Sequence, residues 1–95
     1  MTTLAEILAQ TTPTEDGFTC AIPADWMQGR TSYGGLSAAL ALHAAQACEA
    51  DLPPLRSAQI SFIGPLAGPV RVTATKLRRG RTAAFIQADV VSDAG

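Results

Sequence analysis

The sequence predicts an α+β fold in which an antiparallel sheet wraps around one long buried helix. The first observation is the run from Leu36 to about Ala50, whose alanines and leucines leave almost no polar face in the first three turns. A helix that is apolar on all sides is usually buried on all sides. The second observation is that three later segments alternate apolar and polar residues, as strands with one buried face do. We therefore expect a sheet that encloses this helix.

Composition limits the classes of protein to which the chain can belong. It has 95 residues, 47% of them hydrophobic and 16% charged, which suits one domain, or part of one, with an apolar core. The net charge of −1 gives no footprint for nucleic acid. The chain shows neither a signal peptide nor an apolar run long enough to cross a membrane.

The two cysteines do not have the spacing of metal ligands, and we expect no metal and no cofactor. Cys48 lies in an apolar run and is interpreted as a small core residue. Two cysteines without a disulfide pattern favour a reduced, cytoplasmic setting.

Two elements are expected before the long helix. Residues 3–10 form a short amphipathic helix, in which Thr3 and Glu6 have the spacing of a capping box. Residues 17–23 form a short strand that ends at a proline, and residues 24–32 form an irregular loop. The strand places three apolar side chains on one face: Phe18, Cys20 and Ile22.

Three strands are expected after the helix, over residues 57–64, 70–77 and 82–91. The alternation slips at Lys76 and Leu77, which indicates a β-bulge. A tight hairpin follows, with Gly80 placed for a positive φ. In the last strand, the side chains of Ala84, Ile86, Ala88 and Val90 point to the same face.

The end of the chain suggests association. The strand at 82–91 is left as a long unprotected edge, and one or two further strands would be needed to finish wrapping the helix. We therefore expect the chain to be part of a longer natural unit, with Asp93 and Gly95 at the start of another turn. Phe85 and Val91, on the outer face, are candidates for a subunit contact.

The order of these elements resembles the hot-dog fold, and the details are similar to the N-terminal half of the TesB-like acyl-CoA thioesterases, which carry two hot-dog units in one chain. The resemblance covers roughly residues 18–91 and rests on an ordered set of short pieces. They are Tyr33-Gly34-Gly35 before Ser37-Ala38-Ala39-Leu40, then Leu55-Arg56-Ser57, Phe62-Ile63-Gly64-Pro65, Gly68-Pro69-Val70 and Leu77-Arg78-Arg79-Gly80-Arg81.

The resemblance implies hydrolysis of the thioester of fatty acyl-CoA or a related acyl-CoA. In this fold the acyl chain lies between two hot-dog units, and the N-terminus of the central helix faces the thioester carbonyl. Its free N–H groups and dipole stabilise the developing oxyanion. The family's water-orienting residues lie in the second half, so no catalytic residue transfers to this chain, which we expect to be inactive alone. Its partner is either another copy or a second hot-dog unit.

The candidate substrate-binding residues each have a structural alternative. Gly34 and Gly35 either present backbone donors to the thioester or allow close packing of the helix start. Tyr33 either borders the acyl site or packs as a staple before the helix. Trp26 either lines a pocket for the acyl chain or pantetheine arm, or seals the core.

Other polar residues favour structural roles. A water-activating role for Asp25 would need a second polar partner and a raised pKa, and the sequence shows no such partner, so a loop or cap role is favoured. His43 lies two to three turns beyond the glycines, on the polar stripe of the helix. Arg78, Arg79 and Arg81 have the charge to bind CoA phosphates, but an exposed hairpin is the favoured interpretation.

Three hypotheses follow. The first is the N-terminal half of an acyl-CoA thioesterase. The second is a hot-dog module that binds acyl groups or mediates assembly without catalysis. The third, a hot-dog dehydratase or hydratase, is disfavoured because no His or Asp stands close to Gly34.

Overall fold

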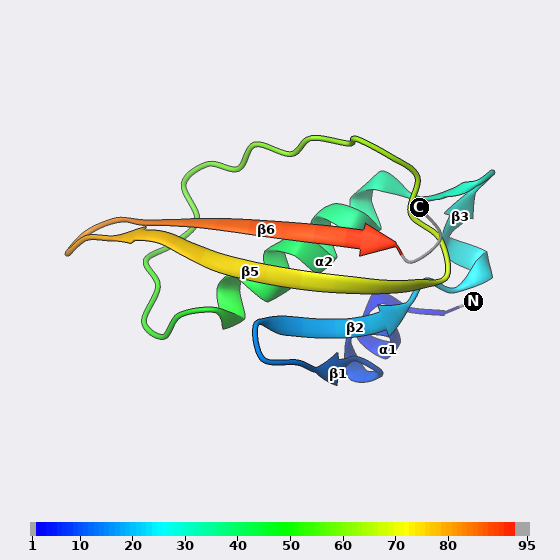
Figure 1. The fold of residues 1–95 in the computed structure, drawn as a ribbon, viewed down its shortest axis with the longest axis horizontal. Coiled ribbons are helices and arrows are strands. Elements are labelled where there is room, and N and C mark those ends of the chain that lie inside the picture. The colour runs from blue at the N-terminus through cyan, green and yellow to red at the C-terminus, as the bar shows by residue number, and fades with distance from the viewer. Residues whose placement is uncertain (1, 93–95) are drawn as a thin grey trace.

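In the computed structural model, which describes residues 2–92, helix α2 (Gly34–Ala47) lies across one face of an antiparallel sheet (Figure 1). The sheet has four strands in the order β1-β2-β5-β6, and a separate two-stranded ribbon contains β3 and β4. The bounds of the other elements are α1 Leu4–Ala9, β1 Thr12–Pro13, β2 Gly17–Ala21, the 3-10 turn η1 Ala24–Trp26, β3 Met27–Gln28, β4 Thr31–Ser32, β5 Pro69–Arg79 and β6 Ala84–Ser92. Asp93 and Gly95 lie outside the described residues.

The predicted capping box of α1 is confirmed. The Thr3 hydroxyl accepts the Glu6 backbone N–H at 3.1 Å, and the Glu6 carboxylate accepts the Thr3 backbone N–H at 3.3 Å. The two bonds satisfy N–H groups that the first turn leaves without intrahelical partners. The helix then places Ile7 in the core.

Strand register confirms the predicted apolar faces. Phe18 of β2 stands opposite Val72 of β5, and Val72 stands opposite Val90 of β6. Directly opposite residues of antiparallel strands point to the same face. The core facing the helices therefore takes buried side chains from β2 and β5, while β6 adds the partly buried Ile86, Ala88 and Val90. The buried members of the core are Ile7, Phe18, Ile22, Leu36, Leu40, Ala44, Val70, Val72 and Ala74.

The bulge is confirmed, whereas the predicted glycine turn is wrong. The register of β5 against β6 shifts between Lys76 and Arg78. Strand β5 then continues to Arg79, and the turn closes through a 2.7 Å bond from the Gly80 N–H to the Ala83 carbonyl. Gly80 has no positive φ, because this wider turn does not need one, whereas Gly68, just before β5, has a φ of 63°.

The prediction that the long helix is enclosed on all sides is also wrong. Leu36, Leu40 and Ala44 recur every four residues and form the buried face, whereas Leu42 on the outer side is 36% exposed. The sheet covers one face of α2 only. Ten α2 residues are not fully buried, and five of these are alanines, four of them only partly buried. A methyl group costs little to expose, so an apolar composition did not require burial all round.

The predicted strand at residues 57–64 is not formed. Residues 52–67 form neither helix nor strand, and they run from the end of α2 back to the start of β5 (Figure 1). This segment is called the arch below. Ile60, Phe62 and Ile63 are 50%, 67% and 95% exposed. The alternating sequence is suited to a strand, but no strand of the described sheet pairs with it.

Candidate functional site

The loop expected at residues 24–32 has internal order that the sequence did not reveal. It contains η1 followed by the ribbon of β3 and β4, in which Met27 pairs with Ser32 and Gln28 with Thr31. Gly29 has a φ of 67°, which permits the tight turn between the two strands. The ribbon leads directly into the N-terminus of α2.

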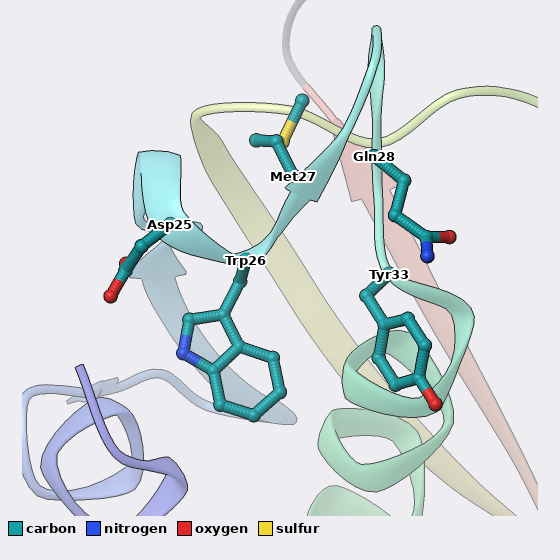
Figure 2. A pocket seen from close by; sticks show the side chains of 5 residues that line it. All are labelled: Asp25, Trp26, Met27, Gln28 and Tyr33. Atoms are coloured by element: carbon teal, nitrogen blue, oxygen red, sulfur yellow. The ribbon is translucent and has the colours of Figure 1, made fainter. Parts of the chain in front are cut away.

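This ribbon brings two predicted site residues together. The Trp26 and Tyr33 rings lie 6.4 Å apart between centroids at an angle of 54°, and the Tyr33 N–H donates to the Trp26 carbonyl at 2.9 Å. Both rings line a shallow depression of about 350 Å³. In Figure 2 they lie on the same side of the ribbon, whereas Met27 points away. Tyr33 is 48% exposed, so its ring faces both the depression and solvent.

Trp26 and Asp25 also hold the start of the chain in place. The Trp26 Nε1–H donates to the Thr2 carbonyl at 2.7 Å, and the Asp25 carboxylate accepts the Thr2 backbone N–H. This hydrogen bond stabilises the charged form and lowers the pKa of Asp25. A general base needs the opposite shift, so the structural interpretation of Asp25 is supported.

Gly34 and Gly35 lie at the start of α2, each beneath an aromatic ring. A Cβ on Gly35 would lie 2.5 Å from Cε2 of Tyr33, and one on Gly34 would lie 3.3 Å from Cζ of Phe62. Close packing therefore explains both glycines, Gly35 most clearly. The same positions carry backbone N–H groups of the first turn, which have no i−4 partner within the helix.

A second depression, of about 430 Å³, opens at this helix end. Its polar wall consists of Gln28, Thr31, Ser32, Gly34 and Ser37, and its other wall consists of Phe62, Ile63, Gly64, Pro65 and Leu66. The Leu66 N–H donates to Thr31 Oγ1 at 3.0 Å, and the Ser32 N–H donates to the Leu66 carbonyl at 2.7 Å. These bonds tie the arch to the ribbon.

Sequence reasoning missed most of this second depression. The sequence pattern places Gln28 and Thr31 in an irregular loop and Phe62 in a strand, and neither pattern indicates that these side chains meet. One sequence signal could have placed Ser37 in this depression: it follows Gly34 by three residues and therefore lies on the same face of the helix. The depression combines hydroxyl and amide groups with an apolar wall at a helix N-terminus, an arrangement that can accept an apolar chain next to a polarised carbonyl.

His43 and the hairpin arginines lie away from both depressions. The His43 ring meets the Phe18 ring edge-on at 5.6 Å, in keeping with the structural interpretation. Arg79 donates to the Asp51 carbonyl at 3.0 Å, just beyond the C-terminal end of α2. The β5–β6 turn and the β3 ribbon lie at opposite ends of the molecule (Figure 1), so the favoured interpretation of an exposed hairpin is retained.

The cysteines differ from expectation in one respect. Cys48, predicted to be a core residue, is exposed because it lies just beyond the last turn of α2. Cys20 is half-buried on β2, and burial raises the pKa of its thiol. Within residues 2–92, no group of three or more metal-binding side chains is placed to hold an ion, and no helix has the length and apolarity to cross a bilayer.

An antiparallel sheet crossed by one helix, with a depression at the helix N-terminus, defines an α+β domain compatible with the hot-dog fold. A family model described as the acyl-CoA thioesterase N-terminal domain matches residues 22–94. The chain belongs to this family and is thioesterase-like, with acyl-CoA as the implied substrate. Comparison with curated proteins and with solved structures gave no match.

Proposed function

We propose that this chain is the N-terminal hot-dog unit of a TesB-like acyl-CoA thioesterase and acts on fatty acyl-CoA or a related acyl-CoA in the cytoplasm. The observation that carries the proposal is the family match, because residues 22–94 include the β3–β4 ribbon, the start of α2 and the arch. These are the elements that surround the two depressions.

In this proposal the acyl-CoA lies along the two depressions. Gln28 lines both, so they adjoin at the ribbon. Phe62 and Ile63 supply an apolar wall, and Trp26 and Tyr33 border the other end. The thioester carbonyl faces the first turn of α2, where the N–H groups of Gly34 and Gly35 and the positive end of the helix dipole favour an oxyanion.

The groups that activate water are assigned to a second hot-dog unit. Asp25 is engaged by Thr2 and has a lowered pKa, and His43 packs on Phe18 away from the depressions. Among the described residues that line the depressions, Asp25 is the only carboxylate, and none is a histidine. The chain then contributes binding walls and one helix terminus, while its partner contributes general-base chemistry.

Ligand binding tests the proposal directly. The chain is titrated with a non-hydrolysable thioether analogue of a long-chain acyl-CoA, and the emission of Trp26, the single tryptophan, is followed. We expect saturable binding that free CoA does not reproduce. Gly34→Leu, which drives a side chain into Phe62, should weaken binding at least about tenfold. Gly80→Ala, at the distant turn, is the matched control. Absence of analogue binding would contradict the proposal.

The alternative is a non-catalytic module that binds acyl groups or mediates assembly, and the lack of an available base at the depressions favours it. Both functions predict no hydrolysis by this chain alone, so turnover by the isolated chain would refute the assignment of catalysis to a second unit. Hydrolysis by a protein in which a second hot-dog unit accompanies this one favours the enzyme, and binding without hydrolysis favours the module. Hydration of crotonyl-CoA would instead indicate the hydratase.

A further inference from the structure

The N-terminus of α2 lacks the groups that usually satisfy the start of a helix. Its N-cap residue, Tyr33, makes no side-chain hydrogen bond to the first turn, and no acidic residue lies in that turn. Helix α1, by contrast, has a complete capping box. The backbone N–H groups of Gly34 and Gly35 form no hydrogen bond with any residue in the range 2–92. At the positive end of the helix dipole, they are available to an acceptor from outside the chain.

Ser37 adds a second, independent observation at this helix end. The residue is only 7% exposed, and it lines the second depression together with Gly34. Its hydroxyl forms no hydrogen bond with any of the described residues. Every fully enclosed side-chain polar atom in this part of the chain has a partner. The Ser37 oxygen is therefore not sealed inside the protein, and it opens to the depression that the residue lines.

The usual partner of a helical serine is already occupied here. A serine hydroxyl in a helix commonly donates to the carbonyl four residues earlier, which for Ser37 is that of Tyr33. The Tyr33 carbonyl already accepts three donors. They are the Leu36 N–H at 3.0 Å, the Ser37 N–H at 3.3 Å and the Ser32 hydroxyl at 3.1 Å. Because a carbonyl oxygen has two lone pairs, the Ser37 hydroxyl finds no room there.

Helix geometry brings the Ser37 hydroxyl over the free N–H group of Gly34. The two residues are three positions apart and lie on one face of α2. Side chains of an α-helix lean toward its N-terminus, so the Ser37 hydroxyl stands over the first turn. Gly34 carries no side chain that would separate the two donors. Both donors therefore converge on one end of the depression, beside the apolar wall that contains Phe62 and Ile63.

We propose that Ser37 is a substrate-binding residue whose hydroxyl donates to the same acyl carbonyl oxygen as the Gly34 N–H. The inference rests on the proposed acyl-CoA function and adds a side-chain donor to it. The two lone pairs of a carbonyl oxygen can accept both bonds, and both bonds strengthen as negative charge develops on that oxygen. A ligand that covers Ser37 without an acceptor leaves its hydroxyl unpaired, so the site selects for the carbonyl itself.

Two non-hydrolysable analogues separate recognition of the carbonyl from recognition of the rest of the ligand. In a dethia analogue of acyl-CoA, a methylene replaces the thioester sulfur and the carbonyl is kept, whereas a thioether analogue lacks the carbonyl. Both are titrated into the chain by isothermal calorimetry. Wild type should bind the dethia analogue more tightly. Ser37→Ala should weaken binding of the dethia analogue about tenfold and should not weaken binding of the thioether analogue.

Two further variants and a spectrum identify the group that binds the carbonyl. Ser37→Thr keeps the hydroxyl and should retain the preference for the dethia analogue. Ser57→Ala is the matched control, because it makes the same change at an exposed residue that lines neither depression. The infrared stretch of a ¹³C-labelled carbonyl in the bound dethia analogue should lie at lower frequency in wild type than in Ser37→Ala, since a hydrogen bond weakens the C=O bond.

Thermal stability gives a readout that needs no ligand. If the Ser37 hydroxyl has no partner within the chain, Ser37→Ala removes no stabilising contact from the free protein. Alanine is also the better helix former. The melting temperature should therefore stay the same or rise, as is common where a group serves binding rather than stability. A structural hydrogen bond at Ser37 would instead make the variant melt at a lower temperature.

The outcomes separate this inference from the proposed function. An unchanged or raised melting temperature in Ser37→Ala, together with loss of the preference for the dethia analogue, supports the inference. A lowered melting temperature, or equal weakening of both analogues, overturns it. Binding of both analogues with no effect of Ser37→Ala overturns this inference alone. If wild type binds neither analogue, the proposed acyl-CoA function fails and this inference fails with it.

Discussion

At the scale of single residues, the glycines differ in how much space surrounds the position that a Cβ atom would occupy. A Cβ on Gly17 would lie 1.8 Å from the backbone oxygen of Val72, because β2 and β5 approach closely there. Backbone atoms of a central strand cannot move aside as a flexible side chain can. Gly64, by contrast, has no atom within 4 Å of the added Cβ and no positive φ.

We therefore expect Gly17→Ala to lower the free energy of unfolding by about 3 kcal/mol or to prevent folding. Gly64→Ala should change it by less than about 0.5 kcal/mol. Urea denaturation followed by circular dichroism measures both. Equal stability of the two variants would show that β2 and β5 are not packed this closely at Gly17.

Asp25 gives a pH-dependent prediction. Its hydrogen bond from the Thr2 N–H lowers the pKa of the folded carboxyl below the ordinary 3.8. A lowered folded pKa stabilises the protein above the unfolded pKa, and this contribution is lost as the pH falls through the folded value. Asp25→Asn should therefore lower the melting temperature slightly at neutral pH.

The difference between wild type and Asp25→Asn should shrink below pH about 4 and vanish once the wild-type carboxyl is protonated. Thermal melts followed by Trp26 emission are suitable, since Trp26 binds Thr2 beside this carboxyl. A difference that grows as the pH falls would contradict the assigned direction.

At the scale of elements, α2 shows that an apolar composition does not by itself define which faces are buried. Leu40 is 0% exposed and Leu42 is 36% exposed, although both lie in the same run of alanines. Only the Leu40 side meets the sheet. The same helix therefore offers a matched pair of leucine positions.

Leu40→Ala should lower the free energy of unfolding by about 2–5 kcal/mol, because it leaves a cavity in the core. Leu42→Ala removes the same atoms from a surface position and should cost less than about 1 kcal/mol. Denaturation of the two variants compares them directly. Similar large losses at both positions would mean that a further layer covers the outer face of α2.

At the scale of the whole molecule, which measures 42 × 25 × 22 Å, some segments are tightly packed and others are not. Strands β2, β5 and β6 and the buried face of α2 form the packed part. At one end, the Lys76 ammonium and Glu49 carboxylate lie 3.0 Å apart and connect β5 to the chain just beyond the end of α2. At the other end, the ribbon and the arch surround the candidate site.

Amide hydrogen exchange should follow this distribution. We expect the slowest exchange in the central part of β5, which has a strand on both sides, and fast exchange at residues 55–63 of the arch. Mass spectrometry of exchanged peptides resolves these regions. Protection at 57–64 equal to that of β5 would show that the arch forms a paired strand in solution.

The sequence by itself determined the local features. The Thr3 capping box, the inward faces of β2, β5 and β6, and the bulge near Leu77 each depend on residues close together in the chain, and each was predicted. The resemblance through Gly34, Gly35 and the short pieces that follow predicted a thioesterase, and the match to residues 22–94 confirms membership of the acyl-CoA thioesterase N-terminal domain family. The TesB-like, two-unit organisation stays a prediction.

Only the tertiary structure decided which patterns found partners. An alternating segment becomes a strand only beside another strand, and residues 57–64 have none in the described sheet. An apolar helix is buried only where a layer covers it, and α2 is covered on one face. The approach of Trp26 to Tyr33 and of Phe62 to Gly34 likewise depends on how distant segments pack, which a local pattern does not encode.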